Sequence, residues 1–518
     1  MSNRFITPSG DSRIDALLEG IKWGSGVAGS GTTLTYSFPS AGASWAYSSS
    51  TEQNAGWWGL NSTQQAAFRA ALSVWSDVAG VRFVESVDGA SYGDIRVAYS
   101  NAVSGNTAAY AYTPGNGSYS GNLLTPNAEA GDVWINPSQT DLGVGTQGFA
   151  TLVHELGHAL GLKHTFESEG QFPAIDPAFD SSKYSVMSYT DYDGAGYIYT
   201  DIGGNRYSIE KVGPTTPMLY DILAIQHLYG ANMNHEAGDT TYRFGTDAQL
   251  KTIWDGGGTD TFDLSDQQTG VVVNLNDGEF SSIGLRQMSY NGPKTLADEN
   301  IAIAFGAEIE NAIGSAYADQ ITGNELDNQL RGGLGNDVLD GGAGTDTALF
   351  SGAHSSYQFS EQAGVVTASG LDGSDQLISI EQLQFDDGLF AINDLLNGTT
   401  PVVVPTRKSE VDFTPGEGST AYFLLELSGP LSGLASVNYS TRDGSAVAGQ
   451  DYVATSGTAL LQPGETHLAI AVELMDDSVA EGDETFSLVV TDPVGGSFSG
   501  GQVELVAQRT IIDNDSIA

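Results

Sequence analysis

Three of the seven histidines in this chain of 518 residues fall within one eleven-residue stretch, 154–164, which reads His-Glu-Leu-Gly-His-Ala-Leu-Gly-Leu-Lys-His. His154 and His158 are four positions apart, so on a helix they project from one face and can chelate one ion. Gly161 is suited to end that helix, because glycine tolerates the left-handed conformation, and the following turn returns His164 to the same ion. Three neutral imidazoles with one open position are typical of a catalytic zinc site.

Glu155 follows the first histidine directly, so its carboxylate can reach a water on the ion without ligating the metal. Zinc lowers the pKa of a bound water to about 7, which would supply a hydroxide-like nucleophile beside a general base. The alternative is a core helix with surface histidines. A lone His-Glu-x-x-His arises by chance in long sequences, whereas the extended form with its Gly and third His is far rarer.

The charge balance of the chain is strongly acidic. Sixty-four Asp and Glu against 19 Lys and Arg give a formal net charge of −45 at pH 7. This excess argues against nucleic acid or an anionic membrane surface as a partner, and it favours calcium, which takes oxygen ligands. Solubility alone is the alternative explanation for part of the charge. The chain has no cysteine, no signal-peptide-like apolar core at its N-terminus and no run of 18 apolar residues, so neither disulfides nor membrane insertion are expected.

The first 232 residues predict an α+β lobe in which strands precede the metal-binding helix. Ser62-Thr63-Gln64-Gln65 reads as a capping box that opens a helix extending to about Val78. Thr216-Pro217 starts a later helix with Pro at its first position, and Gly230 ends it. Residues 165–216 are rich in Gly, Tyr and Asp and are expected to be irregular. Strands are expected at residues 34–38, 81–85, 94–99, 108–112 and 133–136.

From residue 314 the sequence repeats every nine residues, in units that start at Gly314, Gly323, Gly332 and Gly341. An Asp or Asn at the sixth position and an apolar residue at the eighth are typical of the calcium-binding parallel β-roll. The alternative is a flexible Gly-Asp linker, but in such a linker the apolar residue would not recur every nine positions. Residues 255–260 resemble an isolated earlier turn, and residues 350–398 are expected to cap the roll. The candidate calcium ligands are Asp260, Gly333, Gly335, Asp337, Gly342, Gly344 and Asp346.

The pattern changes again after a short linker at 399–405. Strand-like segments then recur at about ten-residue spacing, which predicts a β-sandwich for 406–518. Acidic residues gather where the loops of such a sandwich would meet, and either a calcium cluster or ordinary solvated loops would explain them. The candidate ligands are Asp451, Asp476, Asp477, Glu481, Glu484, Asp513 and Asp515.

Residues 9–398 resemble the serralysin branch of the metzincin peptidases. The resemblance is carried by the histidine motif, by the β-roll repeat and by three further segments: Ser-Gly-Asp-Ser-Arg-Ile-Asp-Ala-Leu-Leu at 9–18, Ser-Val-Met-Ser-Tyr at 185–189 and Asp-Ile-Leu-Ala-Ile-Gln-His-Leu-Tyr-Gly at 221–230. It implies that His154, His158 and His164 bind one zinc ion. It further implies that Glu155 is general base and then proton donor, that Met187 is an apolar floor beneath the metal, and that Tyr189 ligates the resting zinc and swings away to stabilise the oxyanion.

Residues 406–518 resemble a Calx-beta domain, through Asp-Gly-Ser-Ala at 443–446, Asp451-Tyr452, the acidic segment 476–484 and Asp-Asn-Asp at 513–515. The expected fold is therefore an α+β metzincin catalytic domain (1–232), an all-β parallel β-roll with its cap (233–398), a linker (399–405) and an all-β Calx-beta sandwich (406–518). The resemblance to serralysins implies secretion by a type I route that needs no signal peptide.

The expected function is a secreted zinc-dependent endopeptidase, monomeric, with one zinc ion and several structural calcium ions. An extended peptide substrate is expected to add to an edge strand formed by Ala108, Ala109, Tyr110, Ala111 and Tyr112. The Calx-beta-like domain is a candidate for binding extracellular matrix or insoluble substrate. The alternative is a calcium-dependent adhesin whose N-terminal lobe is degenerate, and the intact histidines and Glu155 argue against it.

Overall fold

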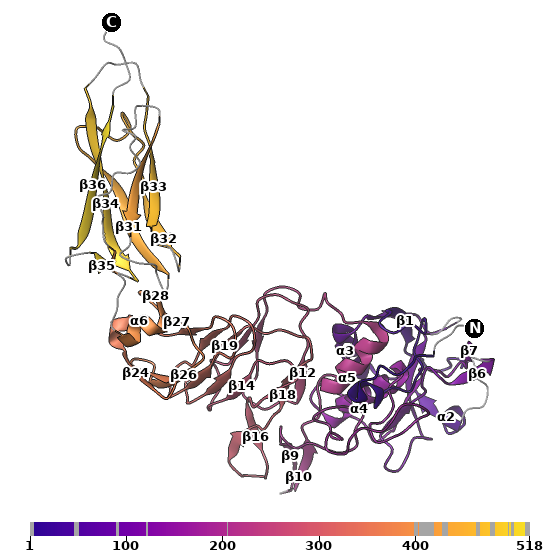
Figure 1. Cartoon of the computed structure of the whole chain (residues 1–518). Helices are drawn as coiled ribbons and strands as arrows, with labels where there is room; N and C mark the ends of the chain where they lie inside the picture. Colours follow the sequence, from indigo (N-terminus) through magenta and orange to yellow (C-terminus); the bar gives the residue numbers. More distant parts are fainter. Residues whose placement is uncertain are drawn as a thin grey trace. The chain divides into compact units, whose positions relative to one another are not determined.

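The computed structural model of the protein describes residues 5–45, 51–89, 93–120, 123–204, 206–397, 402–403, 419–426, 434–462, 467–476, 482–495, 497–498 and 502–512. The chain divides into two compact units, Met1–Asn324 and Glu325–Ala518 (Figure 1). The predicted domain boundaries at 232, 398 and 405 come from changes in the sequence pattern. The division into two units comes from packing and does not test these boundaries, so they stay predictions.

The N-terminal part of the first unit is built on one mixed sheet. Its strands, in spatial order, are β3 (Val81–Glu85), β1 (Thr32–Ser37), β4 (Ile95–Ser100), β8 (Val133–Ile135) and β5 (Ala109–Ala111). The first four run parallel, and β2 (Trp57–Trp58) pairs with β4. β5 is antiparallel to β8 and stands last in the order, so the predicted edge strand lies at the edge of the sheet.

Two long helices pack together beside this sheet, α3 (Ser62–Val78) and α4 (Gln147–Leu160). The apolar face of α3 is buried, and its Trp75 Nε1 donates to Val153 O of α4 at 3.1 Å. The predicted capping box is wrong by one residue. Asn61 caps the helix, because its Oδ1 accepts from Gln64 N at 3.0 Å while Gln64 Oε1 accepts from Asn61 N at 3.1 Å.

The short helices α1 (Ser12–Asp15) and α2 (Thr51–Asn54) and the longer helix α5 (Leu219–Tyr229) also belong to this lobe. α5 begins two residues after Pro217, so the predicted start is wrong. The reason is Asp221, whose Oδ2 accepts from Met218 N at 2.8 Å and so caps the helix at Met218. Gly230 ends α5 as predicted.

The segment 165–216 is less irregular than predicted, because it contains an antiparallel hairpin of β9 (Tyr197–Gly203) and β10 (Arg206–Lys211). This expectation was wrong although the aromatic and β-branched residues of Tyr-Ile-Tyr at 197–199 are of the types enriched in strands. Two other hairpins are β6 (Gly117–Ser120) with β7 (Leu123–Pro126), and β16 (Leu285–Gln287) with β17 (Lys294–Leu296).

Most of the remaining strands of the first unit are three residues long and pair in parallel ladders. β11 (Thr241–Arg243) pairs with β13 (Thr261–Asp263), which pairs with β19 (Asn311–Ile313). β14 (Val272–Asn274) pairs with β20 (Gln320–Thr322), and β12 (Lys251–Ile253) pairs with β18 (Ile301–Ile303), to which β15 (Phe280–Ser281) is antiparallel. The middle residue of most of these strands is buried, which fills the interior with apolar side chains.

In the second unit the nine-residue repeat continues with the same geometry. The strands β21 (Gln329–Arg331), β22 (Val338–Asp340) and β23 (Thr347–Leu349) occupy positions seven to nine of their repeats. Gln329 pairs with Thr347, so one winding takes two repeats, and Leu330, Leu339 and Ala348 at the eighth position are buried as predicted. The cap consists of β24 (Gln358–Gln362), β25 (Val365–Ser369), β26 (Ser374–Ile378), β27 (Gln382–Phe385), β28 (Gly388–Ala391) and α6 (Ile392–Asn397).

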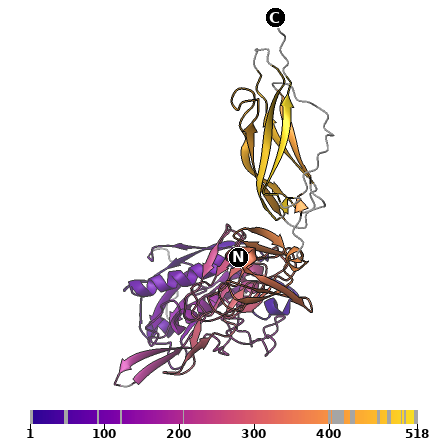
Figure 2. The same cartoon turned by 90° about the vertical axis from the view of Figure 1, so that its left-hand side faces the viewer.

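The C-terminal strands form the predicted β-sandwich, drawn in orange and yellow in Figures 1 and 2. One ladder is β30 (Thr420–Glu426) with β33 (His467–Glu473). The other runs β32 (Ser456–Leu461), β31 (Ala435–Asp443), β34 (Glu484–Val494) and β36 (Glu504–Ile511). Phe423, Val472 and Phe486 lie in the core between them. β29 (Val402–Val403) pairs with β35 (Ser497–Phe498).

Candidate metal centre

The structure brings the three predicted metal-binding histidines together. His154 and His158 lie one turn apart on α4, and Gly161 ends the helix with a φ of 107°, in the left-handed region that favours glycine. The turn then returns His164, so that one ligand atom of each imidazole lies within 4.8 Å of the others. Among the described residues, this is the one group of three or more His or carboxylate residues that converges in this way.

Hydrogen bonds set the protonation of the two helical imidazoles. The Nδ1 atoms of His154 and His158 lie 2.6 Å from Val186 O and 2.8 Å from Leu162 O. A carbonyl oxygen only accepts, so each Nδ1 carries the proton and each Nε2 keeps a free lone pair. Burial lowers the pKa of His154 to about 4 and the pKa of His158 well below its usual range. Both rings are therefore neutral and present Nε2, which is the form that binds a metal.

His164 is oriented from a different side. Its Nδ1 lies 3.0 Å from Glu167 Oε1, and its ring stacks on Phe166 with centroids 5.1 Å apart. Its Nε2 lies 3.1 Å from His158 Nε2. The three nitrogen atoms therefore point at a common position, and the donor set fits a zinc ion with three imidazole ligands.

Met187, for which the sequence resemblance implied a place beneath the metal, is fully buried and lies against Gly157 of α4. It explains the glycine in the middle of the motif, because a Cβ at Gly157 would lie 2.6 Å from Met187 Sδ and 3.3 Å from Trp75 Cζ2. The sulfur therefore packs directly against the backbone of α4 between the two histidines. Any larger residue at position 157 would push that floor away from the metal site.

Asp221 of α5 holds this floor in place, a role that the sequence did not reveal. Its carboxylate accepts from Ser185 Oγ at 2.6 Å, from Val186 N at 2.7 Å and from Met218 N at 2.8 Å. Val186 in turn supplies the carbonyl for His154 Nδ1. Asp221 is fully buried, and burial raises its pKa to about 7 against the effect of these three hydrogen bonds. The helix α5 is thus linked to a metal ligand through two hydrogen bonds.

Glu155 lies on the side of α4 that faces β5. It is 4% exposed, the backbone N–H of Ala111 donates to its carboxylate, and its Oε2 has no hydrogen-bond partner. Burial raises the pKa of Glu155 to about 8, and the Ala111 hydrogen bond opposes this. A buried carboxyl with one free oxygen and a pKa near neutrality is suited to accept and return a proton.

Tyr189 covers the histidines from the solvent side. Its ring lies 4.5 Å from the His164 ring and 5.7 Å from the His154 ring, measured between centroids, and the residue is 67% exposed. Burial of the hydroxyl and the nearby Glu155 and Glu167 carboxylates raise its pKa, so the phenol keeps its proton and is a donor at neutral pH.

Two cavities open on either side of Glu155, and both are lined by Thr107, Ala109 and Tyr189. The first, of about 460 Å³, continues over Ala108 towards Lys211 and Pro214. The second, of about 310 Å³, continues over Tyr110 and Ala111. Together they form a cleft along β5.

The predicted substrate strand follows this cleft, except at its end. The hydroxyl of Tyr112 donates to Glu52 Oε1 at 3.0 Å, and its ring packs on the cluster around Trp134. Tyr112 is not among the lining residues of either cavity. Tyr112 directly follows β5, and its part in the substrate strand stays a prediction.

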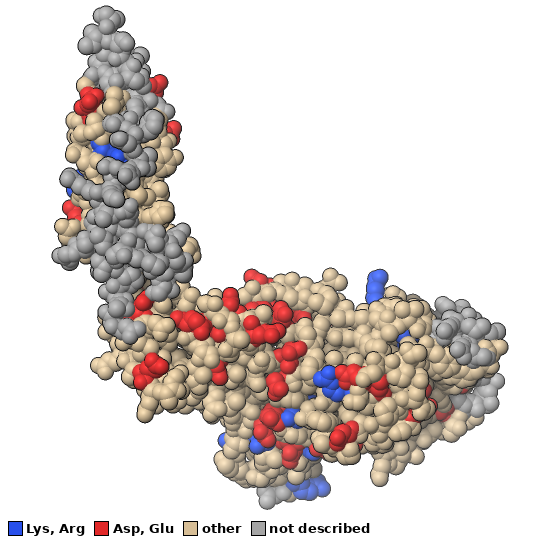
Figure 3. All heavy atoms as spheres, in the orientation of Figure 1, with Lys and Arg blue, Asp and Glu red and all other residues tan. Residues whose placement is uncertain are grey.

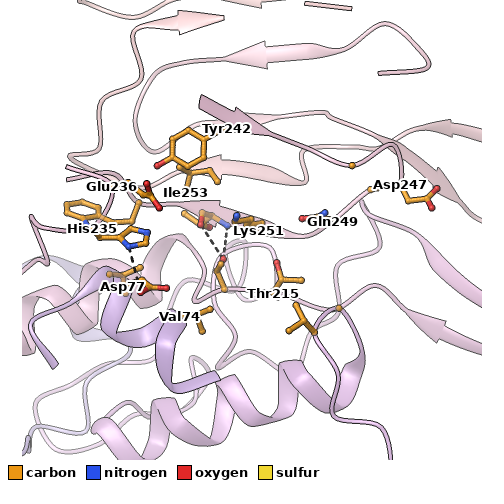
Figure 4. A pocket seen from close by; sticks show the side chains of 18 of the residues that line it. Val74, Asp77, Thr215, His235, Glu236, Tyr242, Asp247, Gln249, Lys251 and Ile253 are labelled. Carbon is orange, nitrogen blue, oxygen red and sulfur yellow. Dashed lines mark hydrogen bonds and ion pairs between the residues drawn. The ribbon is translucent and has the colours of Figure 1, made fainter. Parts of the chain in front are cut away.

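A larger cavity of about 760 Å³ lies elsewhere in the first unit, between α3 and β12 (Figure 4). Asp77, His235 and Lys251 line it, with His235 Nδ1 3.7 Å from Asp77 Oδ1. None of the three converging imidazoles borders it. The metal centre therefore belongs to the smaller cleft.

The candidate calcium ligands of the repeat lie in turns and at buried positions, and calcium binding by them stays a prediction. Asp260, Asp337 and Asp346 are buried, and the Oδ2 atoms of Asp260 and Asp346 have no hydrogen-bond partner. Burial raises the pKa of both Asp260 and Asp346 to about 6. The predicted glycine ligands all have positive φ: Gly333 (101°), Gly335 (141°), Gly342 (90°) and Gly344 (127°). The unpaired buried oxygens of Asp260 and Asp346, beside such turns, fit a cation with oxygen ligands.

The candidate calcium ligands of the sandwich are only partly described. Asp477, Glu481, Asp513 and Asp515 lie outside the described residues. Asp451 accepts from Val447 N at 2.7 Å, which closes a loop. Asp451, Asp476 and Glu484 do not form a converging group within the described part of the chain, so calcium binding by the sandwich stays a prediction.

Comparison with known families gives three consecutive matches. Residues 45–200 match the Matrixin family, residues 220–397 match Peptidase M10 serralysin C terminal, and residues 399–515 match the Calx-beta domain. The α+β fold and the histidine triad lie in the part of the chain that is similar to the Matrixin family. The part that follows is similar to the C-terminal region of the M10 serralysins, and the last part is similar to a Calx-beta domain.

Individual metalloproteases are similar to this chain over part of their length. The chain is 35% identical over 292 residues to "Metalloprotease AprA" of Pseudomonas entomophila (strain L48), covering 52% of this chain and 54% of the relative. It is 35% identical over 336 residues to "Serralysin G" of Dickeya chrysanthemi, covering 60% and 63%. The chain therefore spans between half and two thirds of these relatives. One solved structure, the apo-form Calx CBD1 domain, is 32% identical over 18% of this chain and 83% of its own, with a TM-score of 0.17. No helix in the described part of the chain has the length and apolar character to cross a membrane.

Proposed function

We propose that the chain is a secreted, zinc-dependent endopeptidase that hydrolyses protein substrates and is stabilised by calcium. The observation that carries the proposal is the convergence of three neutral imidazoles beside a buried carboxylate with a free oxygen. The names of its relatives, metalloproteases and serralysins, support the same activity.

The roles of the residues follow from their positions. A zinc ion held by the three Nε2 atoms would supply Lewis acidity and an acidified water. Glu155 takes a proton from that water through its free Oε2 and later returns the proton to the leaving amine. The hydroxyl of Tyr189 donates a hydrogen bond to the oxyanion that develops from the scissile carbonyl. Met187 and Asp221 position the histidines and take no part in the chemistry.

The edge strand β5 has the register to hold an extended peptide. Asn136 N donates to Ala108 O, and Tyr112 N donates to Asp132 O, both at 2.9 Å. In an antiparallel ladder the bonding direction alternates, so the polar backbone groups of Ala109 and Ala111 point away from β8 and towards the cleft. A substrate strand that pairs with them would lie across Glu155, because the Ala111 N–H donates to that carboxylate.

Calcium would bind the repeat through Asp260, Asp337 and Asp346 and the carbonyls exposed by the glycine turns. Export by a type I route is supported by the resemblance to serralysins, and a targeting role of the C-terminal sandwich is supported by its match to the Calx-beta domain.

The test of the peptidase proposal is Glu155→Ala, with zinc content measured in every preparation by elemental analysis. We expect a zinc-loaded variant whose casein cleavage falls by about 100-fold or more, as for loss of a general base. Glu308→Ala removes an exposed carboxylate from the same unit and is the matched control. Full cleavage by the zinc-loaded Glu155→Ala protein would remove Glu155 from the mechanism, and absence of zinc from fresh, active protein would refute the proposal.

A further inference from the structure

We infer that the cavity on the Ala111 side of Glu155 is a subsite for a cationic side chain of the substrate, recognised by Glu19 and Glu169. The inference rests on the proposed peptidase function and specifies a substrate class for it. The subsite would take the guanidinium of Arg or the ammonium of Lys in the residues that precede the scissile bond.

The cavity is part of the cleft, because it is continuous with the metal centre. Of its lining residues, His158 and His164 are metal-ligand candidates, and Glu155 presents its unpartnered, buried Oε2 beside them. Glu19, Glu167 and Glu169 also line this volume of about 310 Å³. A side chain entering from the scissile bond therefore meets three further carboxyl groups.

Glu19 is fixed in place from two sides. Its backbone N–H donates to Gly161 O at 3.1 Å, which ties it to the end of the metal-binding helix. Its Oε1 accepts from Thr113 Oγ1 at 2.6 Å, and Thr113 follows β5 in the chain. The other oxygen, Oε2, is buried and has no hydrogen-bond partner. A buried carboxylate oxygen without a donor is costly, and a cationic donor would satisfy it.

The two other carboxylates come from the loop after His164. Glu167 Oε1 lies 3.0 Å from His164 Nδ1, so this residue also orients the metal centre. Glu169 is exposed, and its backbone forms a two-way bridge with Phe172 at 2.8 Å in each direction, which holds the loop in position. Glu169 is therefore available to a ligand, whereas Glu167 has a second role.

Of the described residues that line this cavity, Lys163 is the one Lys or Arg, and its ammonium group is directed to other partners than the three carboxylates. Lys163 Nζ donates to Ala16 O, to Glu167 O at 2.6 Å and to Pro173 O at 3.0 Å. These three carbonyls use all the donors of an ammonium group. The Lys163 side chain is thus committed to the fold, and the cavity keeps an excess of negative charge.

The other half of the cleft differs in charge. There Lys211 Nζ lies 3.1 Å from Asp191 Oδ2, so the two opposite charges that line this half form their own pair. Electrostatic selection is therefore expected on one side of the scissile bond only. A peptide that adds antiparallel to β5, the more common arrangement, places its N-terminal half over Ala111 and hence over the acidic side.

The test compares peptides that are identical except for Arg, Gln or Glu at each of the three positions before the scissile bond. For the wild-type protein we expect kcat/KM for the best Arg peptide to exceed that of its Gln counterpart by about 10-fold and the Glu peptide to be poorest. In the double variant Glu19→Gln/Glu169→Gln the Arg-to-Gln ratio should fall towards one, and Glu169→Lys should favour the Glu peptide. Gln at position 19 can still accept from Thr113, and Glu308→Gln is the control that should keep the wild-type ratio.

A binding experiment distinguishes this inference from the proposed peptidase activity. The same peptides, fluorescently labelled, are titrated into zinc-loaded Glu155→Ala protein and followed by anisotropy. Tighter binding of Arg peptides that weakens with added salt and is lost in the double variant supports the subsite even if no peptide is cleaved. Equal binding of Arg and Gln peptides, or a preference that survives in the double variant, would overturn the inference, whatever the cleavage assay shows.

Discussion

At the scale of single residues, the metal centre depends on groups that never touch the metal. The imidazole of His154 keeps its Nε2 lone pair because Val186 O binds its Nδ1, and Asp221 fixes Val186 through its N–H. A hydrogen bond made by the second ring nitrogen sets the tautomer and the orientation of a ligating histidine. The sequence motif identifies the ligands, and the packing of α5 determines how well one of them is held.

We therefore expect Asp221→Asn to weaken zinc binding by roughly 10–100-fold. The amide has one acceptor oxygen and turns an NH2 group towards a backbone N–H donor, which also costs stability, on the order of 1–3 kcal/mol. Zinc affinity is measured by competition with a chromophoric chelator, and stability by urea unfolding. Asp266→Asn, at an exposed position of the same unit, is the control. An Asn variant that holds zinc as tightly as the wild type would show that the Asp221 link is not needed.

A pH effect follows from Glu19. Burial raises the pKa of Glu19 from 4.5 to about 7. The hydrogen bond from Thr113 opposes this shift, and the nearby Glu169 and Glu167 carboxylates reinforce it. The pKa of Tyr119, which also faces Glu19, is raised as well, so this phenol stays neutral. The folded state therefore binds more protons than the unfolded state between pH 4.5 and 7. The stabilising contribution of Glu19 is fully present below about pH 4.5 and is lost as the pH rises through 7.

Glu19→Gln, which stays neutral, should accordingly be more stable than the wild type above pH 7, by roughly 1–3 kcal/mol. The difference should shrink steadily on acidification towards pH 4.5. Urea unfolding of both proteins at pH 5, 6.5 and 8, at constant zinc and calcium, measures it, with Glu308→Gln as the control. A stability difference that does not change with pH would mean that Glu19 is not the titrating group.

At the scale of elements, the edge strand β5 offers a sharp test of substrate alignment. The N–H of Ala109 points away from β8, so Ala109→Pro removes a donor to the substrate without breaking the ladder. We expect kcat/KM for peptides to fall by about 10-fold, roughly the effect of one lost hydrogen bond in a desolvated cleft. Ala109→Ser keeps the N–H and is the matched control, and unchanged thermal unfolding verifies the fold. Undiminished cleavage by the proline variant would place the substrate elsewhere.

The elements also show what the sequence could and could not predict. The metal-binding helix and the nine-residue repeat were predictable, because their side chains recur at the spacing of the structure itself, as His154 and His158 or Leu330 and Leu339 do. The capping residue of α3 and the start of α5 were missed, since Asn61 and Asp221 act through side chains that fold back on the backbone. The hairpin β9–β10 was missed because tyrosine, glycine and aspartate were read as loop composition.

The residues of the candidate site likewise divide into those that the sequence predicts and those that only the fold reveals. His154, Glu155, His158 and His164 follow from spacing along one helix and turn. Glu19 stands 135 residues before His154 and carries no motif, so only the fold could bring it to the cleft. Asp221 lies within a segment that resembles the family, but its bonds to the loop around Val186 are tertiary and leave no periodic signal.

At the scale of the whole molecule, the acidic charge is the dominant feature. On the face seen in Figure 3, Asp and Glu side chains gather over the part of the molecule that carries the short strands of the repeat. A net charge of −45 in the absence of cations destabilises a compact state through self-repulsion. Bound calcium would relieve it where Asp260 and Asp346 each leave a buried carboxylate oxygen without a partner. We therefore expect calcium to raise the melting temperature of zinc-loaded protein by several degrees or more.

The mass-action form of this stabilisation makes the calcium prediction quantitative. An ion that binds only the folded repeat contributes RT ln(1 + [Ca²⁺]/Kd), so at 100 times Kd each site adds about 2.7 kcal/mol. Calcium is titrated back into calcium-free, zinc-loaded protein while the melting temperature is followed. Asp346→Asn removes one buried carboxylate and should reduce the total increment, whereas the exposed Asp266→Asn should not. If melting does not depend on calcium, the unpaired oxygens of Asp260 and Asp346 are not ion ligands, and the acidic repeat must be stabilised by its apolar interior alone.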